Sequence, residues 1–251
     1  MSTDIHLEHL AVGYRPPATL RGIDVHLEAG SLVAILGPNG SGKSTLVKTL
    51  LGLLPPLAGR IHGLATHGVR TAYLAQQSDI DRSFPITVLE TVVMGLWPRL
   101  GHVGRVTADH LRQAREALGR VGMAHTEQRT IAELSAGQFQ RILFARTMLQ
   151  DAALIIMDEP FNAVDESTVQ DLMAYIHQWH QEGRTVLVVL HDLGLALEAF
   201  PLTLLAGGGR VRYGATAEVL CRRNMVDAGY WGSSSHALER LFNEPDTARA
   251  L

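Results

Sequence analysis

The stretch GPNGSGKST, Gly37 to Thr45, constrains the fold more than any other part of the sequence. It follows the apolar run SLVAIL and opens the run TLVKTLLGLL, matching G-x-x-x-x-G-K-[ST] between a strand and a helix. Glycines let backbone N–H groups converge on phosphate oxygens, and the helix N-terminus adds a partial positive charge. The sequence therefore predicts a nucleotide phosphate site, formed by Gly37, Pro38, Asn39, Gly40, Ser41, Gly42, Lys43, Ser44 and Thr45. In such a loop the lysine reaches the β- and γ-phosphates and Ser44 holds Mg²⁺.

Three nearly continuous apolar runs predict buried strands. SLVAIL (31–36), ALIIM (153–157) and TVLVVL (185–190) are each followed by polar residues and then a helical pattern. Strands of this kind form a parallel sheet covered on both faces, so the fold class is α/β. Before the phosphate loop, apolar residues instead recur at every second position, which predicts half-buried antiparallel strands. These residues are Ile5, Leu7, Ile23, Val25 and Leu27.

Between Ser78 and Gln150 the pattern becomes helical. Thr107 is the expected N-cap of one helix, whose apolar positions follow at helical spacing. In ELSAGQFQR (133–141), Ser135 followed by Gln138 fits the capping box, in which a hydroxyl and an amide satisfy unpaired backbone donors. A helix cap does not explain Gly137.

Acidic and imidazole side chains follow two of the buried strands. Asp158 and Glu159 come directly after ALIIM, at the carboxyl edge where ligands bind in open α/β sheets. Beside a phosphate loop, Asp158 is placed to hold Mg²⁺, and Glu159 to polarise an attacking water. His191 ends the next strand, where it either hydrogen-bonds a γ-phosphate oxygen or has only a structural role.

Composition narrows the class of partner and compartment. The formal charge of −3 argues against the broad basic surface that nucleic-acid binding requires. The single cysteine, Cys221, suits a reducing compartment, and the first residues lack the pattern of a secretory signal. The longest apolar runs are much shorter than the roughly twenty residues of a membrane span. We therefore expect a cytoplasmic protein that reaches a membrane only through a partner.

Taken together, the motifs resemble the nucleotide-binding subunits of ATP-binding cassette (ABC) transporters over roughly residues 3 to 220. The phosphate loop is followed in the family's order by Gln76 in YLAQQ, the signature LSAGQ (134–138), LIIMDE, FNAVD and His191. The resemblance implies a phosphate-loop NTPase core with a mixed sheet. It places a RecA-like core at 1–77 and 151–230, a helical subdomain at about 78–150 and a C-terminal tail at 231–251.

The resemblance also assigns roles to single residues. The signature residues, Leu134, Ser135, Ala136, Gly137 and Gln138, would act on the ATP held by a second copy of the chain in a head-to-tail dimer. Tyr14 would stack on adenine, Asp165 would cross the dimer, and Gln76 would contact Mg²⁺ or the water. Gln77 is a competing candidate for that last role, although the spacing from Tyr73 favours Gln76. Three departures from the family pattern, Ala136, Asn162 and Val164, remove no charged catalytic group.

The cargo is indicated only by the segment that follows the glutamines. FPITVLETVVMG, within residues 81–100, resembles the corresponding stretch of ATPases from bacterial importers of zinc, manganese or related metals, and Thr87 with Glu90 fits a capping box. The histidine pairs His62/His67 and His177/His180 have no third ligand nearby in sequence, so we interpret them as solvated surface residues.

We therefore predict an ATPase that powers an ABC importer of a divalent metal, with ATP and Mg²⁺ as cofactors. Its expected partners are a second copy, membrane-spanning permease subunits and a solute-binding protein, at the cytoplasmic side of the inner membrane. The alternatives are an ABC ATPase for another substrate and a soluble ABC ATPase with no transport role. A phosphate-loop kinase would leave LSAGQ and His191 without a function.

Overall fold

The computed structural model describes residues 4–63, 70–77, 80–101 and 104–230. They form two compact units. The phosphate-loop unit comprises residues 6–26 and 32–62 together with the described residues from 190 onward, and the signature unit comprises the described remainder. The predicted tail 231–251, His67 and the expected boundary at Ser78 lie outside the described residues.

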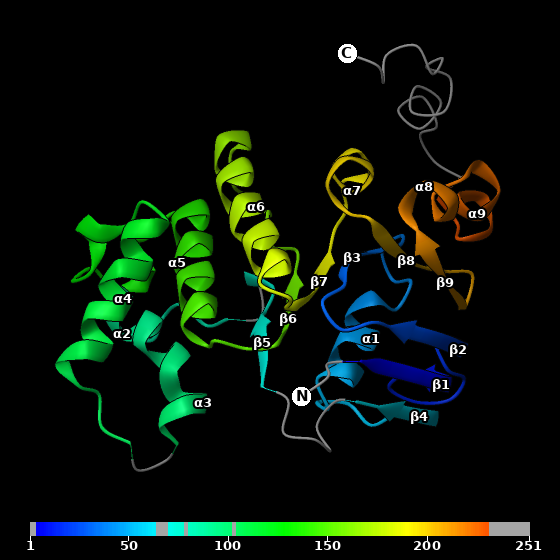
Figure 1. Cartoon of the computed structure of the whole chain (residues 1–251), viewed down its shortest axis with the longest axis horizontal. Coiled ribbons are helices and arrows are strands. Elements are labelled where there is room, and N and C mark those ends of the chain that lie inside the picture. Colours follow the sequence, from blue (N-terminus) through cyan, green and yellow to red (C-terminus); the bar gives the residue numbers. More distant parts are fainter. Residues whose placement is uncertain (1–3, 64–69, 78–79, 102–103, 231–251) are drawn as a thin grey trace. The chain divides into compact units, whose positions relative to one another are not determined.

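The phosphate-loop unit begins with a three-stranded sheet in the order β2-β1-β4 (Figure 1). Buried apolar residues alternate with exposed polar ones at the start of β1 and along most of β2, as the period-two pattern predicts, whereas the last three residues of β1 are all buried. β1 and β4 are antiparallel, with His6 opposite His62 and Glu8 opposite Arg60. The strands are β1 (Ile5–Val12), β2 (Leu20–Leu27) and β4 (Ala58–His62).

The rest of this unit surrounds β3 (Leu32–Leu36), in which every residue is buried. β3 pairs in parallel with β8, and β8 pairs antiparallel with β9. A buried strand followed at once by the phosphate loop and a helix is what the sequence predicts. The other elements are α1 (Lys43–Leu50), α7 (Leu193–Ala199), β8 (Leu202–Gly207), β9 (Arg210–Ala215), α8 (Thr216–Val219) and α9 (Arg222–Asp227).

The signature unit contains three parallel strands in the order β5-β6-β7. β6 and β7 are buried along their whole length, which confirms two of the predicted apolar strands. Asp158 is the last residue of β6, so it lies at the C-terminal edge of these parallel strands. The strands are β5 (Thr71–Leu74), β6 (Leu154–Asp158) and β7 (Thr185–Val189).

Helices form the rest of the signature unit, and α2, α4 and α5 pack on one another (Figure 1). Their N-termini are capped as predicted, by Thr87, Thr107 and Ser135, each within a capping box. The helices are α2 (Val88–Val93), η3 (Met94–Leu96), α3 (Trp97–Leu100), α4 (Ala108–Arg120), η4 (Ala124–Thr126), η5 (Ile131–Glu133), α5 (Ala136–Leu149) and α6 (Glu166–Gln181).

Candidate functional site

The backbone of the phosphate loop depends on glycine at two central positions. Gly40 has φ of 75° and Gly42 has φ of 101°, a region that residues with a Cβ atom rarely occupy. Gly42 is the N-cap of α1, and within the described chain no side chain caps it. The first N–H groups of α1 are therefore left for a ligand such as phosphate.

Lys43 supplies a buried positive charge to this loop. Its ammonium donates to the carbonyl oxygens of Gly37 at 2.7 Å and Pro38 at 3.1 Å, and only 6% of the residue is exposed. The buried Ser41 hydroxyl has no hydrogen-bond partner among the described residues. Ser44, in the first turn of α1, is exposed. Buried donors and a desolvated cation fit the triphosphate that the sequence predicts here.

Tyr230 supports the phosphate loop, and sequence reasoning missed it. Burial raises the pKa of its hydroxyl to about 12, and a hydrogen bond with the backbone of Gly37 acts in the opposite direction. The neighbouring Gly229 lies against Pro38. No motif links these residues, because the contact joins the start of the loop to a segment about 190 positions later.

Two other predicted ATP contacts belong to the phosphate-loop unit. Tyr14 is 68% exposed, so its ring is accessible for stacking. His191 is also exposed and follows Leu190, whose N–H donates to the Ile35 carbonyl at 3.0 Å. This bond places the segment that leads to His191 beside β3, the strand that runs into the phosphate loop.

In the signature unit, the two predicted carboxylates follow directly from β6. Asp158 is only 2% exposed, whereas Glu159 is partly accessible. Glu159 has φ of 53°, in the left-handed region, and its N–H donates to the Val189 carbonyl at 3.2 Å. A strained backbone of this kind in a non-glycine residue costs roughly 1–3 kcal/mol and tends to occur at functional sites.

Two amides hold the carboxylate of Glu159. The Gln76 side chain donates to Glu159 Oε2 at 3.0 Å, and Asn162 donates to the same oxygen at 3.3 Å. Gln77 instead donates to the Ala136 carbonyl at 3.0 Å and to Gln140 Oε1 at 2.7 Å. Of the two candidate glutamines, Gln76 is therefore the one that reaches the carboxylate.

The signature segment is a capped helix N-terminus packed against its own chain. Ser135 Oγ accepts from the Gln138 N–H at 3.2 Å, and Gln138 Oε1 accepts from the Ser135 N–H at 3.1 Å. Ala136 is the first helical residue of α5, so alanine suits that position. A Cβ atom on Gly137 would lie 2.9 Å from the Ala163 carbonyl oxygen. Gly137 is therefore needed for close packing, which a helix cap alone does not explain.

Four signature residues line a pocket of about 640 Å³ together with His125, Arg141 and Asp165; they are Ser135, Ala136, Gly137 and Gln138. Asp165 is the N-cap of α6, and hydrogen bonds from Ser167 and Thr168 hold its pKa well below the usual range. Arg141 bonds the Thr168 hydroxyl and lies 3.5 Å from the Asp165 carboxylate. The Asp165 carboxylate is thus fixed within its own chain, and its contact across a dimer stays a prediction.

A family model described as "ABC transporter" matches residues 20–162, more than half of the chain. The chain belongs to the ABC transporter family. It is 38% identical over 246 residues to the zinc transport system ATP-binding protein TroB of Treponema pallidum, covering 96% of this chain and 92% of that protein. It is 37% identical to the manganese transport system ATP-binding protein MntB of Bacillus subtilis, covering 88% of this chain and 90% of that protein.

Solved structures agree with this assignment to the ABC family. The chain superposes with a TM-score of 0.80 on a metal-chelate type ABC transporter in an inward-facing conformation, at 26% identity, covering 92% of this chain and 90% of that one. The ADP conformation of an ATP-binding cassette of an ABC transporter shows the same fold, with a TM-score of 0.73 at 22% identity, covering 92% of this chain and 100% of that one. Among the described helices of this ABC chain, none has the length and apolar character needed to cross a membrane.

Proposed function

We propose that this chain is the ATP-hydrolysing subunit that powers an ABC importer of a divalent metal ion, zinc or manganese. The observation that carries the ATPase assignment is Glu159, a carboxylate in a left-handed backbone position that Gln76 and Asn162 both contact. A carboxylate fixed in this way can accept a proton from a water that attacks the γ-phosphate.

The chemistry needs positioning and charge neutralisation more than covalent catalysis. The N–H groups of the phosphate loop and the Lys43 ammonium would bind the β- and γ-phosphates, with Tyr14 stacking on adenine. His191 would donate to a γ-phosphate oxygen, and Glu159 would receive the proton of the water. The amide of Gln76 would keep the carboxylate and the water in line.

Oxygen donors are what Mg²⁺ prefers, and Ser44, Gln76 and Asp158 provide them. When bound with ATP, the ion would neutralise the charge of the phosphate oxygens. Asp158 is buried at the end of β6, where a charged carboxylate is stabilised by a cation.

ABC cassettes dimerise and pair with permease subunits in transporter complexes. In this chain the surface that would face a second copy is the pocket at the signature. The Ser135 oxygen accepts a bond from the Gln138 N–H, but the proton of its hydroxyl can still be donated to a phosphate. The dimer would be head to tail, at the cytoplasmic side of the membrane, with permease subunits and a solute-binding protein completing the importer.

The metal cargo is supported by the similarity to TroB and MntB over most of the chain. A local feature agrees with it. The segment FPITVLETVVMG resembles the corresponding stretch in ATPases of metal importers. Within it, a helix begins after the predicted cap Thr87, and the side chain of Phe84 is exposed. In ABC transporters this region receives the membrane subunit.

Replacing Glu159 with glutamine tests the ATPase assignment. The variant keeps the size of the side chain but cannot accept the proton, so turnover should fall roughly 10²- to 10⁴-fold while ATP binding is kept. ATP-bound dimer should accumulate, which size-exclusion chromatography with ATP detects. Turnover near the parent rate would remove Glu159 from its proposed role.

Reconstitution with the native membrane partner tests the cargo. The measurement is ATP-dependent uptake of Zn²⁺, Mn²⁺ and Fe²⁺ into vesicles, and we expect uptake of zinc or manganese. Vesicles that contain the Glu159→Gln variant serve as the control. If none of the three metals is taken up, the assignment of a metal substrate is wrong, whereas the assignment as an ATPase is unaffected. Copurification with ribosomes or DNA, instead of a hydrophobic membrane subunit, would favour an ABC ATPase with no transport role.

A further inference from the structure

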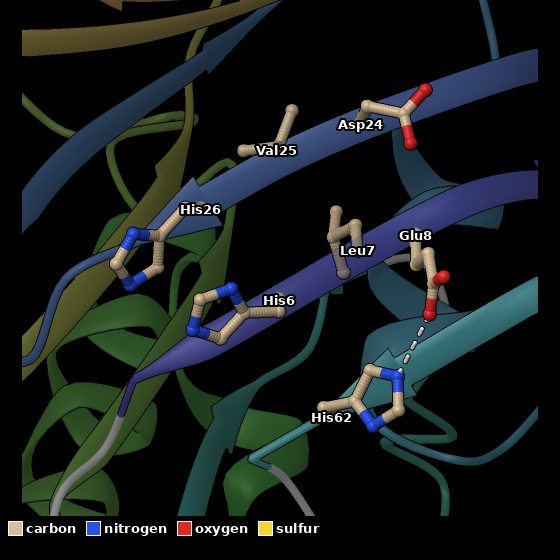
Figure 2. A pocket seen from close by; sticks show the side chains of 7 residues that line it. All are labelled: His6, Leu7, Glu8, Asp24, Val25, His26 and His62. Atoms are coloured by element: carbon tan, nitrogen blue, oxygen red, sulfur yellow. Dashed lines mark hydrogen bonds and ion pairs between the residues drawn. The ribbon is translucent and has the colours of Figure 1, made fainter.

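Three histidines lie in one row across the three-stranded sheet of the phosphate-loop unit. His26 is on β2, His6 on the central strand β1 and His62 on β4 (Figure 2). His6 and His62 are register partners, and the rings of His6 and His26 stack with centroids 3.9 Å apart and planes 13° apart. All three side chains are exposed, so they share the solvent face of the sheet.

The pairing of the strands explains why three residues so far apart in sequence meet here. The Thr19 N–H donates to the Val12 carbonyl at one end of β1 and β2, and the His6 and His26 rings meet at the other. The two strands are therefore antiparallel. Because neighbouring strands lie about 4.8 Å apart, the backbones of the outer two histidines are separated by about 10 Å. Side chains that reach inward from both outer strands can meet above the central one.

Two carboxylates on the same face flank the row. Glu8 Oε2 lies 3.2 Å from Nε2 of His62, and Figure 2 shows this contact as a dashed line. Asp24 is on β2, two residues before His26, and the N–H of His9 donates to it at 2.7 Å. Arg60, opposite Glu8, offsets part of this negative charge.

We propose that His6, His26 and His62 bind one divalent transition-metal ion, of which zinc is the best match. Imidazole nitrogen is a preferred ligand of zinc, copper and nickel, whereas manganese and magnesium prefer oxygen. Three protein ligands and one water complete a tetrahedral zinc site. Glu8 would act as the outer partner that orients the His62 ring, as carboxylates commonly do for metal-bound histidine.

Binding requires the rings to turn. In the part of the chain that the structure describes, no three histidine, cysteine or acidic side chains already converge as metal ligands do. The rings of His6 and His26 stack face to face, and because both side chains are exposed, rotation about their side-chain bonds would be the movement that directs a nitrogen of each toward one ion. The inference is separate from the proposed ATPase function, because none of these residues takes part in the phosphate or signature segments.

Titration of the purified, tag-free, nucleotide-free chain with Zn²⁺ by calorimetry tests this proposal. The parent should bind one equivalent of Zn²⁺. Ni²⁺ should bind at the same site, and the affinity for Mn²⁺ should be at least tenfold lower than that for Zn²⁺. His6→Asn, His26→Asn and His62→Asn should each weaken zinc at least tenfold, and Glu8→Gln should weaken it by roughly 10- to 100-fold. His177→Asn, in a histidine pair on α6, is the matched control and should bind as the parent does.

The row variants should keep ATP binding and the circular dichroism of the parent, which separates a lost site from a lost fold. If the zinc affinity is unchanged in all three histidine variants, the proposal is overturned. It is also overturned if His177→Asn lowers the zinc affinity as much as the three row variants do. Equal affinity for Zn²⁺ and Mn²⁺ would contradict an imidazole site.

Discussion

The phosphate loop and the signature segment both lead into the N-terminus of a helix, but the chain builds them by opposite means. In the phosphate loop, Gly42 is the N-cap of α1 and no described side chain satisfies the first N–H groups. In the signature segment, Ser135 and Gln138 cap α5, each side chain accepting a hydrogen bond from the other residue's backbone N–H. The first end is left ready for a ligand, whereas the second is stable without one.

Their glycines differ in the same way. Gly40 has a positive φ, and a Cβ atom there would meet no other atom within 4 Å. Gly137 has a helical backbone, but a Cβ atom would press on the Ala163 carbonyl. One glycine is needed for its conformation and the other for its lack of volume. The glycines of these two segments are therefore required for different physical reasons.

The largest effect is expected at the phosphate loop. Lys43→Ala removes the buried cation and should lower ATP affinity, and hydrolysis should fall by roughly 10³-fold because a charge that stabilises the transition state is lost. Lys48→Ala, one turn later on α1, is the control and should bind ATP as the parent does. Equilibrium binding of a fluorescent ATP analogue gives the affinity. Normal binding by Lys43→Ala would contradict the proposed role of this loop.

At the signature, the expected effect falls on hydrolysis alone. Ser135→Glu places a negative charge where a second copy would bring its phosphate, so hydrolysis should fall by roughly 10²-fold while ATP binding is spared. Gln170→Glu makes the same change of charge at an exposed position of α6. If Ser135→Glu hydrolyses ATP at the parent rate, or does so as a monomer, the two-copy site is wrong.

Replacing each of these two glycines with alanine separates the effect of backbone conformation from the effect of side-chain volume. Gly137→Ala should lower the free energy of unfolding by about 1–3 kcal/mol through overpacking, with ATP affinity unchanged. Gly40→Ala should lower it by about 1–2 kcal/mol through the left-handed backbone, and should also weaken ATP. Urea denaturation with and without ATP measures both quantities. Equal ATP affinities in the two variants would remove the distinction drawn between these glycines.

The smallest effect concerns Asp165, which caps α6 beside the signature pocket. Its folded-state pKa is lowered, so its carboxylate contributes stability above the usual aspartate pKa, and this contribution is lost as pH falls through the lowered value. The difference in unfolding free energy between the parent and Asp165→Asn should thus be constant from pH 7 to 5 and shrink below about pH 4. A difference that does not change with pH would contradict this.

Local patterns in the sequence predicted much of the fold. The caps at Thr87, Thr107 and Ser135 are confirmed because a capping box joins residues only three positions apart. The buried strands β3, β6 and β7 are confirmed because continuous apolar runs leave few other structures. The α/β class and the family are confirmed as well.

Contacts over long sequence distances could not be predicted in this way. The bond from Gln76 to Glu159 spans 83 positions, and the Gly137 contact with Ala163 depends on how α5 packs. The histidines give the clearest case. Sequence reasoning paired His62 with its neighbour His67, whereas strand register places His62 opposite His6. His62 is exposed, as its interpretation as a solvated surface residue predicts, and its neighbour across the strands could not be found from sequence spacing.

Gln140 gives the signature helix a further consequence. Its buried side chain donates to the Pro160 carbonyl at 2.8 Å, next to Glu159, and accepts from Gln77, next to Gln76. One amide thus connects α5, the helix proposed to contact a neighbouring subunit's nucleotide, to the chain neighbours of Gln76 and Glu159, the two residues proposed to position the water. In the proposed mechanism, a shift of α5 on contact with a second copy would therefore reach the hydrolytic residues through Gln140.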